Sequence, residues 1–413
     1  MDSVDSLIIE NPNPTIKGNE YQIVFLLAFV SFICSTDSML LMPLGEIIMK
    51  TYKISPQLST LVISIYSLFA GVSGFLSASI MDQFDRKKLL VGTFIGFSIG
   101  TLLCGFAYDY GLLVFYRGIT GIFGGIVGGV GVAIISDLIP YKRRSTAMSI
   151  MSLSFAVAAI TGVPLGIHLA NTYNLQMPFR ILAFISFVTI IPIVLWLPKI
   201  NAHLTEHRKI ENPFRAANDI LKDTNQVLAL MMAFFIVFSH FVVLQFIVPY
   251  MENNVGFDKK LVPIMYAIGG VCAIISAPFI GKISDRVGNL KSFTILMILS
   301  FIPIIMTTHI HKTSIPLAIF ICALFFILAA GRMIPAYTIM SGATLPEKRG
   351  GFMSMRSACL ELGTGVASVV SGFIVKQGID GKYIHFNYVG YVSVAVGLLS
   401  IYIASKVKIV SNK

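Results

Sequence analysis

The chain has 413 residues, of which 55% are apolar and only 12% are charged, and its mean hydropathy is +0.81. Soluble domains carry roughly 25% charged residues, so this chain lacks the polar groups that a water-exposed surface needs, and its natural solvent is lipid. The net charge of +11 favours membrane topology over nucleic-acid binding, because the basic residues lie mostly in short segments between apolar runs.

Twelve apolar runs are long enough to cross a bilayer as helices, which takes about 20 residues each. In chain order they are 22–47, 57–81, 89–108, 111–139, 145–170, 178–198, 227–251, 259–281, 293–310, 315–341, 351–375 and 387–405. The alternating segments of about ten residues that build membrane β-barrels are missing from the sequence, so the predicted fold is all-α. The acidic N-terminus lacks the basic region of a cleavable signal peptide, so the first run is expected to remain as a span.

Lysine and arginine predict the orientation of these spans. If both termini are cytoplasmic, the inner segments hold 20 of the 31 basic residues and the outer segments hold 8. Because cytoplasmic loops are enriched in Lys and Arg, both termini are predicted to lie in the cytoplasm. The remaining three, which are Arg117, Arg332 and Arg356, fall inside spans.

The longest loop lies at the midpoint of the chain, with six runs before it and six after it. A short helix is predicted in it near 213–222. The predicted organisation is a cytoplasmic tail at 1–20, a six-helix bundle at 21–198, a cytoplasmic linker at 199–226, a second six-helix bundle at 227–405 and a cytoplasmic tail at 406–413.

The two halves repeat two inner-loop patterns. GFLSASIMDQFDRKK follows the second run and GKISDRVGNLK follows the eighth, while DLIPYKRRSTAMS follows the fourth and TLPEKRGGFMS follows the tenth. A repeat at half-chain separation is typical of carriers built from two bundles.

These loops resemble a motif of the major facilitator superfamily, Gly-x-x-x-Asp-Arg-x-Gly-Arg-Arg, and the resemblance extends over about 21–405. Within the superfamily, the chain resembles the bacterial twelve-helix drug, sugar and purine efflux group. The first copy matches at Asp82, Arg86 and Lys87 and departs at Ala78, Gln83 and Asp85. The second copy has Gly281, Asp285, Arg286 and Gly288, but Asn289 where Arg is usual.

The resemblance implies a conformational lock at the cytoplasmic ends of the helices. In it, Arg86 would pair with Asp137 after the fourth run, and Asp82 would face the start of the eleventh run near Arg356. Ion pairs at helix ends that form in one state and break in the other make a bistable element. The alternative is that these charges serve topology alone, which we favour for the neighbouring lysines.

Two further segments resemble motifs of proton antiporters. Arg117 and Gly121 match an Arg-x-x-x-Gly pattern that is linked in the family to proton transfer, although an arginine snorkelling to the outer interface is the alternative. The segment GVPLG, with Gly162, Pro164 and Gly166, resembles the fifth-helix signature of sugar and purine antiporters. Its proline frees a backbone carbonyl and its glycines allow close helix approach; a generic kink is the alternative.

Two carboxylates lie near the middle of spans, Asp37 in the first and Glu361 in the eleventh. A buried carboxylate without a fixed partner can load a proton from one side and release it to the other, so both are candidates for proton coupling. Glu361 has an alternative as the structural ion-pair partner of Arg356 or Arg332. The candidate substrate cavity consists of Asp37, Arg117, Gln245 and Arg332.

No pattern indicates a metal, a cofactor or a nucleotide site. His168 and His240 are isolated on apolar helices and are expected to be interior side chains, the five cysteines are expected to be small core residues, and no P-loop of the form GxxxxGK[ST] occurs. Energy is therefore expected to come from the proton gradient.

The resemblance implies a multi-pass carrier of the bacterial cytoplasmic (inner) membrane that exports a small organic molecule in exchange for protons by alternating access. The expected partners are the substrate, protons and lipid, with no nucleic acid, and the expected state is a monomer. A proton symporter or a facilitator for uptake is the first alternative, and a non-transporting receptor is the second. An intramembrane enzyme would need a nucleophile–base pair or metal ligands that the sequence does not offer.

Overall fold

The computed structural model describes residues 20–81, 84–139, 141–200, 213–311, 313–345 and 349–410. Within these ranges, 12 helices are long and apolar enough to cross a membrane. This confirms the predicted all-α architecture. In lipid every backbone N–H and C=O must find a partner inside its own segment, and a helix satisfies that need for each apolar run separately.

The first half of the chain supplies six of the spans, and the fifth of them is built from three consecutive helical pieces. The elements are α1 (Glu20–Leu40), α2 (Gly45–Tyr52), α3 (Pro56–Ile80), α4 (Arg86–Cys104), α5 (Tyr110–Leu138), α6 (Tyr141–Val157), the π-helical turn η2 (Ala158–Gly162), α7 (Val163–Thr172) and α8 (Met177–Trp196).

The second half supplies the other six spans, a short helix before them and a small hairpin. The elements are α10 (Pro213–Lys222), α11 (Thr224–Tyr250), the π-helical turn η3 (Met251–Val255), the 3₁₀ turn η4 (Lys259–Leu261), α12 (Val262–Val287), α13 (Asn289–His309), α14 (Ile315–Ser341), α15 (Arg349–Ile374), β1 (Lys376–Gln377), β2 (Tyr383–Ile384) and α16 (Phe386–Lys406).

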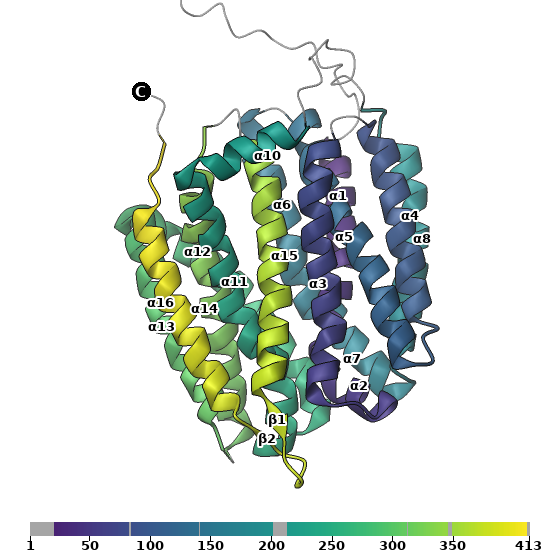
Figure 1. Cartoon of the computed structure of the whole chain (residues 1–413), viewed down its shortest axis with the longest axis vertical. Coiled ribbons are helices and arrows are strands. Elements are labelled where there is room, and N and C mark those ends of the chain that lie inside the picture. The colour runs from purple at the N-terminus through teal and green to yellow at the C-terminus, as the bar shows by residue number, and fades with distance from the viewer. Residues whose placement is uncertain are drawn as a thin grey trace, which may run out of the picture.

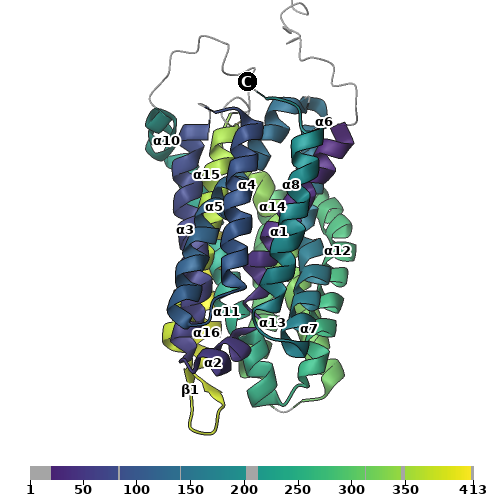
Figure 2. The same ribbon diagram turned by 90° about the vertical axis from the view of Figure 1, so that its right-hand side faces the viewer.

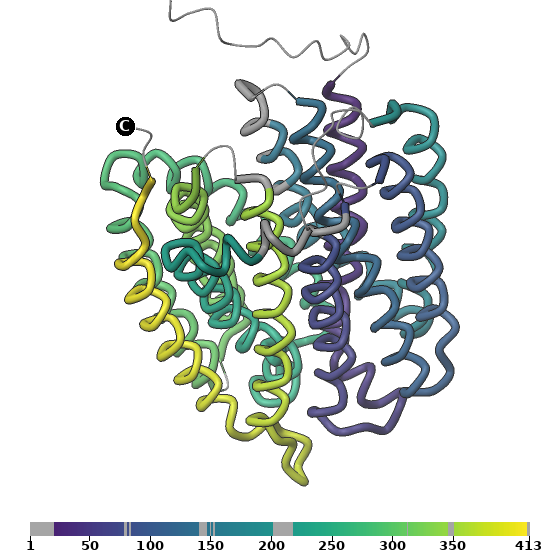
Figure 3. Tube along the Cα trace, turned by 45° about the horizontal axis from the view of Figure 1, so that its top comes forward, coloured from purple at the N-terminus to yellow at the C-terminus, as the bar shows by residue number. Residues whose placement is uncertain are grey.

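The helices form two bundles that stand side by side (Figure 1). Helices of the first half, in purple to blue, occupy one side, and those of the second half, in green to yellow, occupy the other (Figure 3). The two bundles meet along two seams, where α3 packs on α15 and where η2 and α7 pack on α12. Each seam joins the second helix of one half to the fifth helix of the other half, as a two-fold relation between the halves requires.

The two ends of the molecule differ. Helix α10 lies across one end, at which α16 also finishes, and we refer to this as the α10 end (Figure 1). Helix α2 and the β1–β2 hairpin lie at the opposite end, the hairpin end (Figure 2). Helix α10 occupies the positions at which the sequence predicts a short linker helix.

Aspartates are the N-cap residues of several helices. The side chains of Asp85, Asp109 and Asp223 accept hydrogen bonds from backbone N–H groups in the first turns of α4, α5 and α11. The first N–H groups of a helix have no partner inside it, so each cap satisfies donors at a bundle end and fixes where its span begins.

The structure differs from the sequence prediction in the first span. Helix α1 ends at Leu40 instead of continuing to residue 47, and the separate helix α2 follows from Gly45. Pro43 lies in the turn between them, and its ring removes a backbone N–H and blocks the helical path. The antiparallel β1–β2 pair was not predicted either, because its strands are only two residues long and show no periodicity in the sequence.

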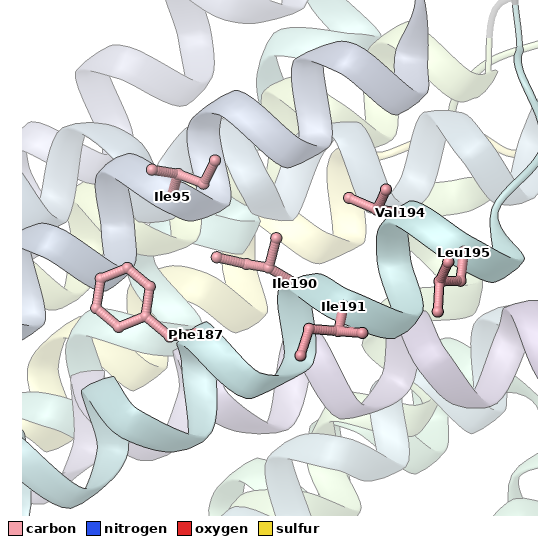
Figure 4. A pocket seen from close by; sticks show the side chains of 6 residues that line it. All are labelled: Ile95, Phe187, Ile190, Ile191, Val194 and Leu195. Atoms are coloured by element: carbon pink, nitrogen blue, oxygen red, sulfur yellow. The ribbon is translucent and has the colours of Figure 1, made fainter.

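The outer surface of the bundles is apolar. Large side chains such as Phe184, Leu195 and Phe279 are each more than half exposed, as lipid-facing residues should be. One hollow in this surface is lined by α4 and α8 with apolar side chains alone, which are Ile95, Phe187, Ile190, Ile191, Val194 and Leu195 (Figure 4). With no polar group to orient a solute, this hollow fits an acyl chain better than a transported molecule.

Candidate functional site

A fully buried ion pair lies inside the first bundle. Asp37 of α1 and Arg117 of α5 each have 0% side-chain exposure, and Nη1 of Arg117 is 2.5 Å from Oδ2 of Asp37. Thr101 of α4 approaches the other carboxylate oxygen at 3.5 Å, and the guanidinium lies 4.3 Å from the ring centre of Tyr66 on α3. Arg117 is therefore an interior residue held by four helices and does not snorkel to the interface.

Glu361 faces this pair from the other bundle. It lies on α15, where its carboxylate accepts a hydrogen bond from the Ser67 hydroxyl of α3. It also interacts electrostatically with Arg117. Its charge also acts on Cys34 and Tyr66 of the first bundle. Unlike Asp37, Glu361 keeps part of its surface accessible. The charges of α1, α5 and α15 thus form one cluster across the α3–α15 seam.

This seam is tight where the cluster lies. A side chain in place of Gly71 of α3 would overlap Leu362 of α15, and one in place of Gly365 of α15 would overlap Leu68 of α3. Small residues at such positions let two helix backbones approach closely. The seam therefore holds Glu361 at a fixed distance from the first bundle in this conformation.

The cluster is electrically unbalanced. It holds two carboxylates, Asp37 and Glu361, and one guanidinium, Arg117, so it carries one net negative charge when both acids are ionised. Asp37 is committed to Arg117 by direct contact, whereas neither Arg332 nor Arg356 contacts Glu361. Binding of a single proton makes the cluster neutral. In a low-dielectric interior the neutral cluster has a lower free energy than the charged one.

The GVPLG segment packs against the same region. The π-helical turn η2 precedes Pro164, and this wide turn was not predicted from the sequence. A side chain at Gly162 would overlap Thr36, the neighbour of Asp37, and a side chain at Gly166 would overlap Leu40. On its other side, Ile160 of η2 packs on α12 at Gly270. The segment thus touches both the helix that carries Asp37 and the second bundle.

The α10 end contains one ion pair that the resemblance implies. Nε of Arg86 lies 3.1 Å from Oδ2 of Asp137, which joins the start of α4 to the end of α5. Arg356 lies with its guanidinium 4.9 Å from the ring centre of Tyr337. Asp82, the other member of the predicted lock, lies outside the described residues.

The second copy of the loop motif looks different from the first. Asp285 and Arg286 are both exposed at the end of α12, and neither makes an ion pair with another described residue. The first copy thus contains a formed ion pair in this conformation, whereas the second forms none with the part of the chain that the structure describes.

The remaining candidates of the substrate cavity are buried in the second bundle. Gln245 of α11 donates from Nε2 to the hydroxyl of Ser368 on α15 at 2.5 Å. Arg332 of α14 donates from Nη1 to the Ser300 hydroxyl of α13 at 3.0 Å, so it points away from the α3–α15 seam. His240 stacks on Phe325. The prediction of an interior position is wrong for His168, which is exposed on α7.

A polar cluster at the hairpin end was not predicted from the sequence. Glu46 of α2 is buried, and it accepts hydrogen bonds from Asn253 of η3, at close range, and from Lys259 of η4 at 3.2 Å. Lys50 lies 2.6 Å from the same carboxylate. Burial alone would raise the pKa of Glu46, but the bonds from Lys50 and Asn253 and the charge of Lys259 outweigh burial and lower it.

This cluster ties the first bundle to the second across the hairpin end, where Glu46 belongs to the first half of the chain and its partners Asn253 and Lys259 belong to the second. In the sequence prediction Glu46 falls within the first apolar run, and Lys50 and Lys259 count only as basic residues of the outer segments. The break after α1 at Pro43 is the one signal that could have drawn attention to Glu46.

Within the described part of the chain, no group of three or more His, Cys, Asp or Glu side chains is placed to hold a metal ion. The five cysteines are free, and each is buried or half-buried.

A model of the Major Facilitator Superfamily matches residues 27–325 and 230–408. The chain belongs to this superfamily. Among curated relatives, the uncharacterised MFS-type transporter YceJ of Bacillus subtilis (strain 168) is 22% identical over 358 residues, covering 86% of this chain and 89% of the relative. The multidrug resistance protein MdtG of Proteus mirabilis (strain HI4320) is 24% identical over 371 residues, covering 86% and 90%.

Solved structures give the same fold. A bacterial homologue of the human lysosomal transporter Spinster, inward-facing and occupied, aligns with a TM-score of 0.72 at 14% identity and covers 94% of this chain and 97% of that one. The nucleoside transporter NupG aligns with a TM-score of 0.71 at 13% identity, covering 93% and 99%. This member of the superfamily is thus a multi-pass membrane transporter with two six-helix bundles, and its relatives are transporters, not enzymes.

Proposed function

We propose that this transporter exports a small organic molecule in exchange for protons, with Glu361 as the group that carries the proton. The observation that supports the proposal is the cluster of Asp37, Arg117 and Glu361. It places an acid of the second bundle beside a closed ion pair of the first. The alternation of the bundles would then change the surroundings of Glu361 without breaking the Asp37–Arg117 pair.

The proposed cycle follows from charge balance. With a proton on Glu361 the cluster is neutral, and the α3–α15 seam can close around it at low electrostatic cost. When the seam opens to the other side, water reaches Glu361 and the proton leaves, and the ionised carboxylate is then stabilised by water and by Arg117. Substrate that binds only to the ionised form would move in the opposite direction to the proton.

Three observations support export from a bacterial cytoplasm. The MdtG proteins among the relatives are named multidrug resistance proteins and are 24–25% identical to this chain. The GVPLG segment, which resembles an antiporter signature, contacts α1 beside Asp37. The excess of Lys and Arg in alternate loops favours cytoplasmic termini. We also propose that Asp82, Arg86, Asp137, Asp285, Arg286 and Arg356 gate the α10 end, as the resemblance to the loop motif implies; the Arg86–Asp137 ion pair supports this.

The test uses purified protein in liposomes with an imposed pH gradient and an internal pH dye. Drugs, sugars, nucleobases and organic anions are screened for substrate-driven proton movement. The expected result is proton movement opposite to the substrate in the native protein. In Glu361→Gln this movement is lost while exchange of labelled substrate without a gradient continues. Asp380→Asn in the exposed β1–β2 loop is the matched control and should behave as the native protein.

Other outcomes have definite meanings. Proton movement in the same direction as the substrate would make the protein a symporter and overturn the proposal of export. Unchanged proton movement in Glu361→Gln would remove this residue from the coupling step. Substrate movement with no proton movement in the native protein would make it a facilitator.

A further inference from the structure

The two bundles treat their buried arginines differently. In the first bundle, Arg117 is balanced by Asp37 in direct contact. In the second bundle, Arg332 is equally buried, at 1% exposure, but no carboxylate among the described residues pairs with it. A guanidinium cannot shed its charge by losing a proton at any ordinary pH, so Arg332 keeps a positive charge that no described side chain balances.

The surroundings of Arg332 provide neutral contacts only. Its Nη1 donates to the Ser300 hydroxyl at 3.0 Å and to the Met297 thioether at 3.1 Å, both on α13. Its Nε is buried and has no acceptor. A thioether is a weak acceptor, so most of the hydrogen-bonding capacity of this cation is not used by strong partners.

A second buried polar atom without a hydrogen-bond partner belongs to His240 on α11. The Nδ1 atom of His240 is buried without a partner, while its ring stacks on Phe325 with 4.9 Å between ring centres. The charge of Arg332 acts on this imidazole. His240 thus packs on α14, the helix that carries Arg332, and Arg332 in turn contacts the Ser300 hydroxyl of α13, while no described carboxylate pairs with Arg332.

We propose that Arg332 is the centre of an anion-binding site in the second bundle, with Ser300 and His240 as neighbouring polar groups. The ligand class is a small monovalent anion or an anionic group of an organic molecule, because one guanidinium provides one balancing charge and can bind a carboxylate through two N–H groups. Where the anion belongs to a transported molecule, the inference rests on the proposed function and specifies an acidic substrate.

The test measures anion binding in the absence of transport. A negative result would therefore count against the anion site and not against proton coupling. Purified protein in a nonionic detergent is titrated with sodium chloride and, separately, with sodium benzoate, and thermal unfolding is recorded. A ligand that binds the folded state raises the melting temperature with its concentration. We compare the native protein with Arg332→Gln, and with Lys291→Gln as the matched control, which removes an exposed positive charge from α13.

We expect Arg332→Gln to bind the anion roughly 10- to 100-fold more weakly, the range set by hydrogen bonds to a charged group, and Lys291→Gln to match the native protein. Stabilisation by chloride alone would assign the site to a free ion, and stabilisation by benzoate would assign it to a group on an organic ligand. No stabilisation by either anion, or equal stabilisation in Arg332→Gln, would overturn the proposal.

If Arg332→Gln does not fold, Arg332→Lys keeps the charge and removes the two-pronged geometry. Its benzoate affinity should then fall about 10-fold relative to the native protein. Equal affinity in Arg332→Lys would overturn the assignment of Arg332 as the binding centre.

Discussion

Removal of both members of the Asp37–Arg117 pair should destabilise the protein by clearly less than the sum of the two single removals. Both side chains have 0% exposure, so Asp37→Asn leaves a buried guanidinium without its contact partner and Arg117→Gln leaves a buried carboxylate. Breaking a buried pair in this way costs about 3–5 kcal/mol for each single change. In the double variant no charge of the pair remains, and we expect a cost at least about 2 kcal/mol below the sum of the singles.

The assay is equilibrium unfolding in mixed micelles with increasing dodecyl sulfate, followed by helical circular dichroism. The native protein, the two single variants and the double variant form a double-mutant cycle, which gives the coupling energy between Asp37 and Arg117 directly. Asp380 and Lys382, an exposed pair with 3.7 Å between charged atoms, provide the control cycle, in which the coupling should be at most about 1 kcal/mol. Additive losses at Asp37 and Arg117, with no more coupling than in the control, would refute the claim that the buried pair acts as a unit.

The same variants make a prediction about transport. In Asp37→Asn, the carboxylate that remains beside Arg117 is Glu361, which must stay ionised to balance the guanidinium. Substrate exchange should therefore continue while proton movement stops, as measured in the liposome assay. Proton-coupled export at the native rate in Asp37→Asn would contradict this charge balance.

Three further changes test other parts of the structure. The folded-state pKa of Glu46 is lowered, so its contribution to stability is fully present above the ordinary glutamate pKa of 4.5 and is lost as the pH falls below it. We therefore expect Glu46→Gln to lower the free energy of unfolding by about 1 kcal/mol at pH 7. Its thermal stability should also depend less on pH between about pH 5 and 3. Gly162→Ala should lower the free energy of unfolding by about 1–3 kcal/mol, because the new methyl group overlaps Thr36. Gly92→Ala is the control, and with open space around it the change should be neutral or stabilising by up to about 1 kcal/mol. Equal effects of the two changes in thermal melts would mean that η2 does not pack tightly on α1. Asp137→Asn removes the ion pair at the α10 end and should change the turnover rate of transport without changing substrate affinity, so an altered affinity at constant rate would count against a lock.

Some features of the molecule could be predicted because a single stretch of chain decides them. Each apolar run must form a helix in lipid, whatever surrounds it, and this is why the number of spans and the helix α10 in the linker agree with the sequence prediction. The resemblance also implied the Arg86–Asp137 contact, because a short motif at fixed spacing carries that pair. Pro43 is a local signal too, but the sequence analysis did not use it to end α1.

The sequence by itself determined that the chain crosses the membrane and that charged side chains lie in its interior. Only the tertiary structure decided which charges meet. Asp37 and Arg117 are 80 positions apart and Glu361 lies in the other bundle, so their association depends on the packing of α1, α5 and α15. The same packing left Arg332 with neutral neighbours on α13. Helix packing in lipid is set by shape over many small contacts, and no local pattern of residues encodes the register in which distant helices meet.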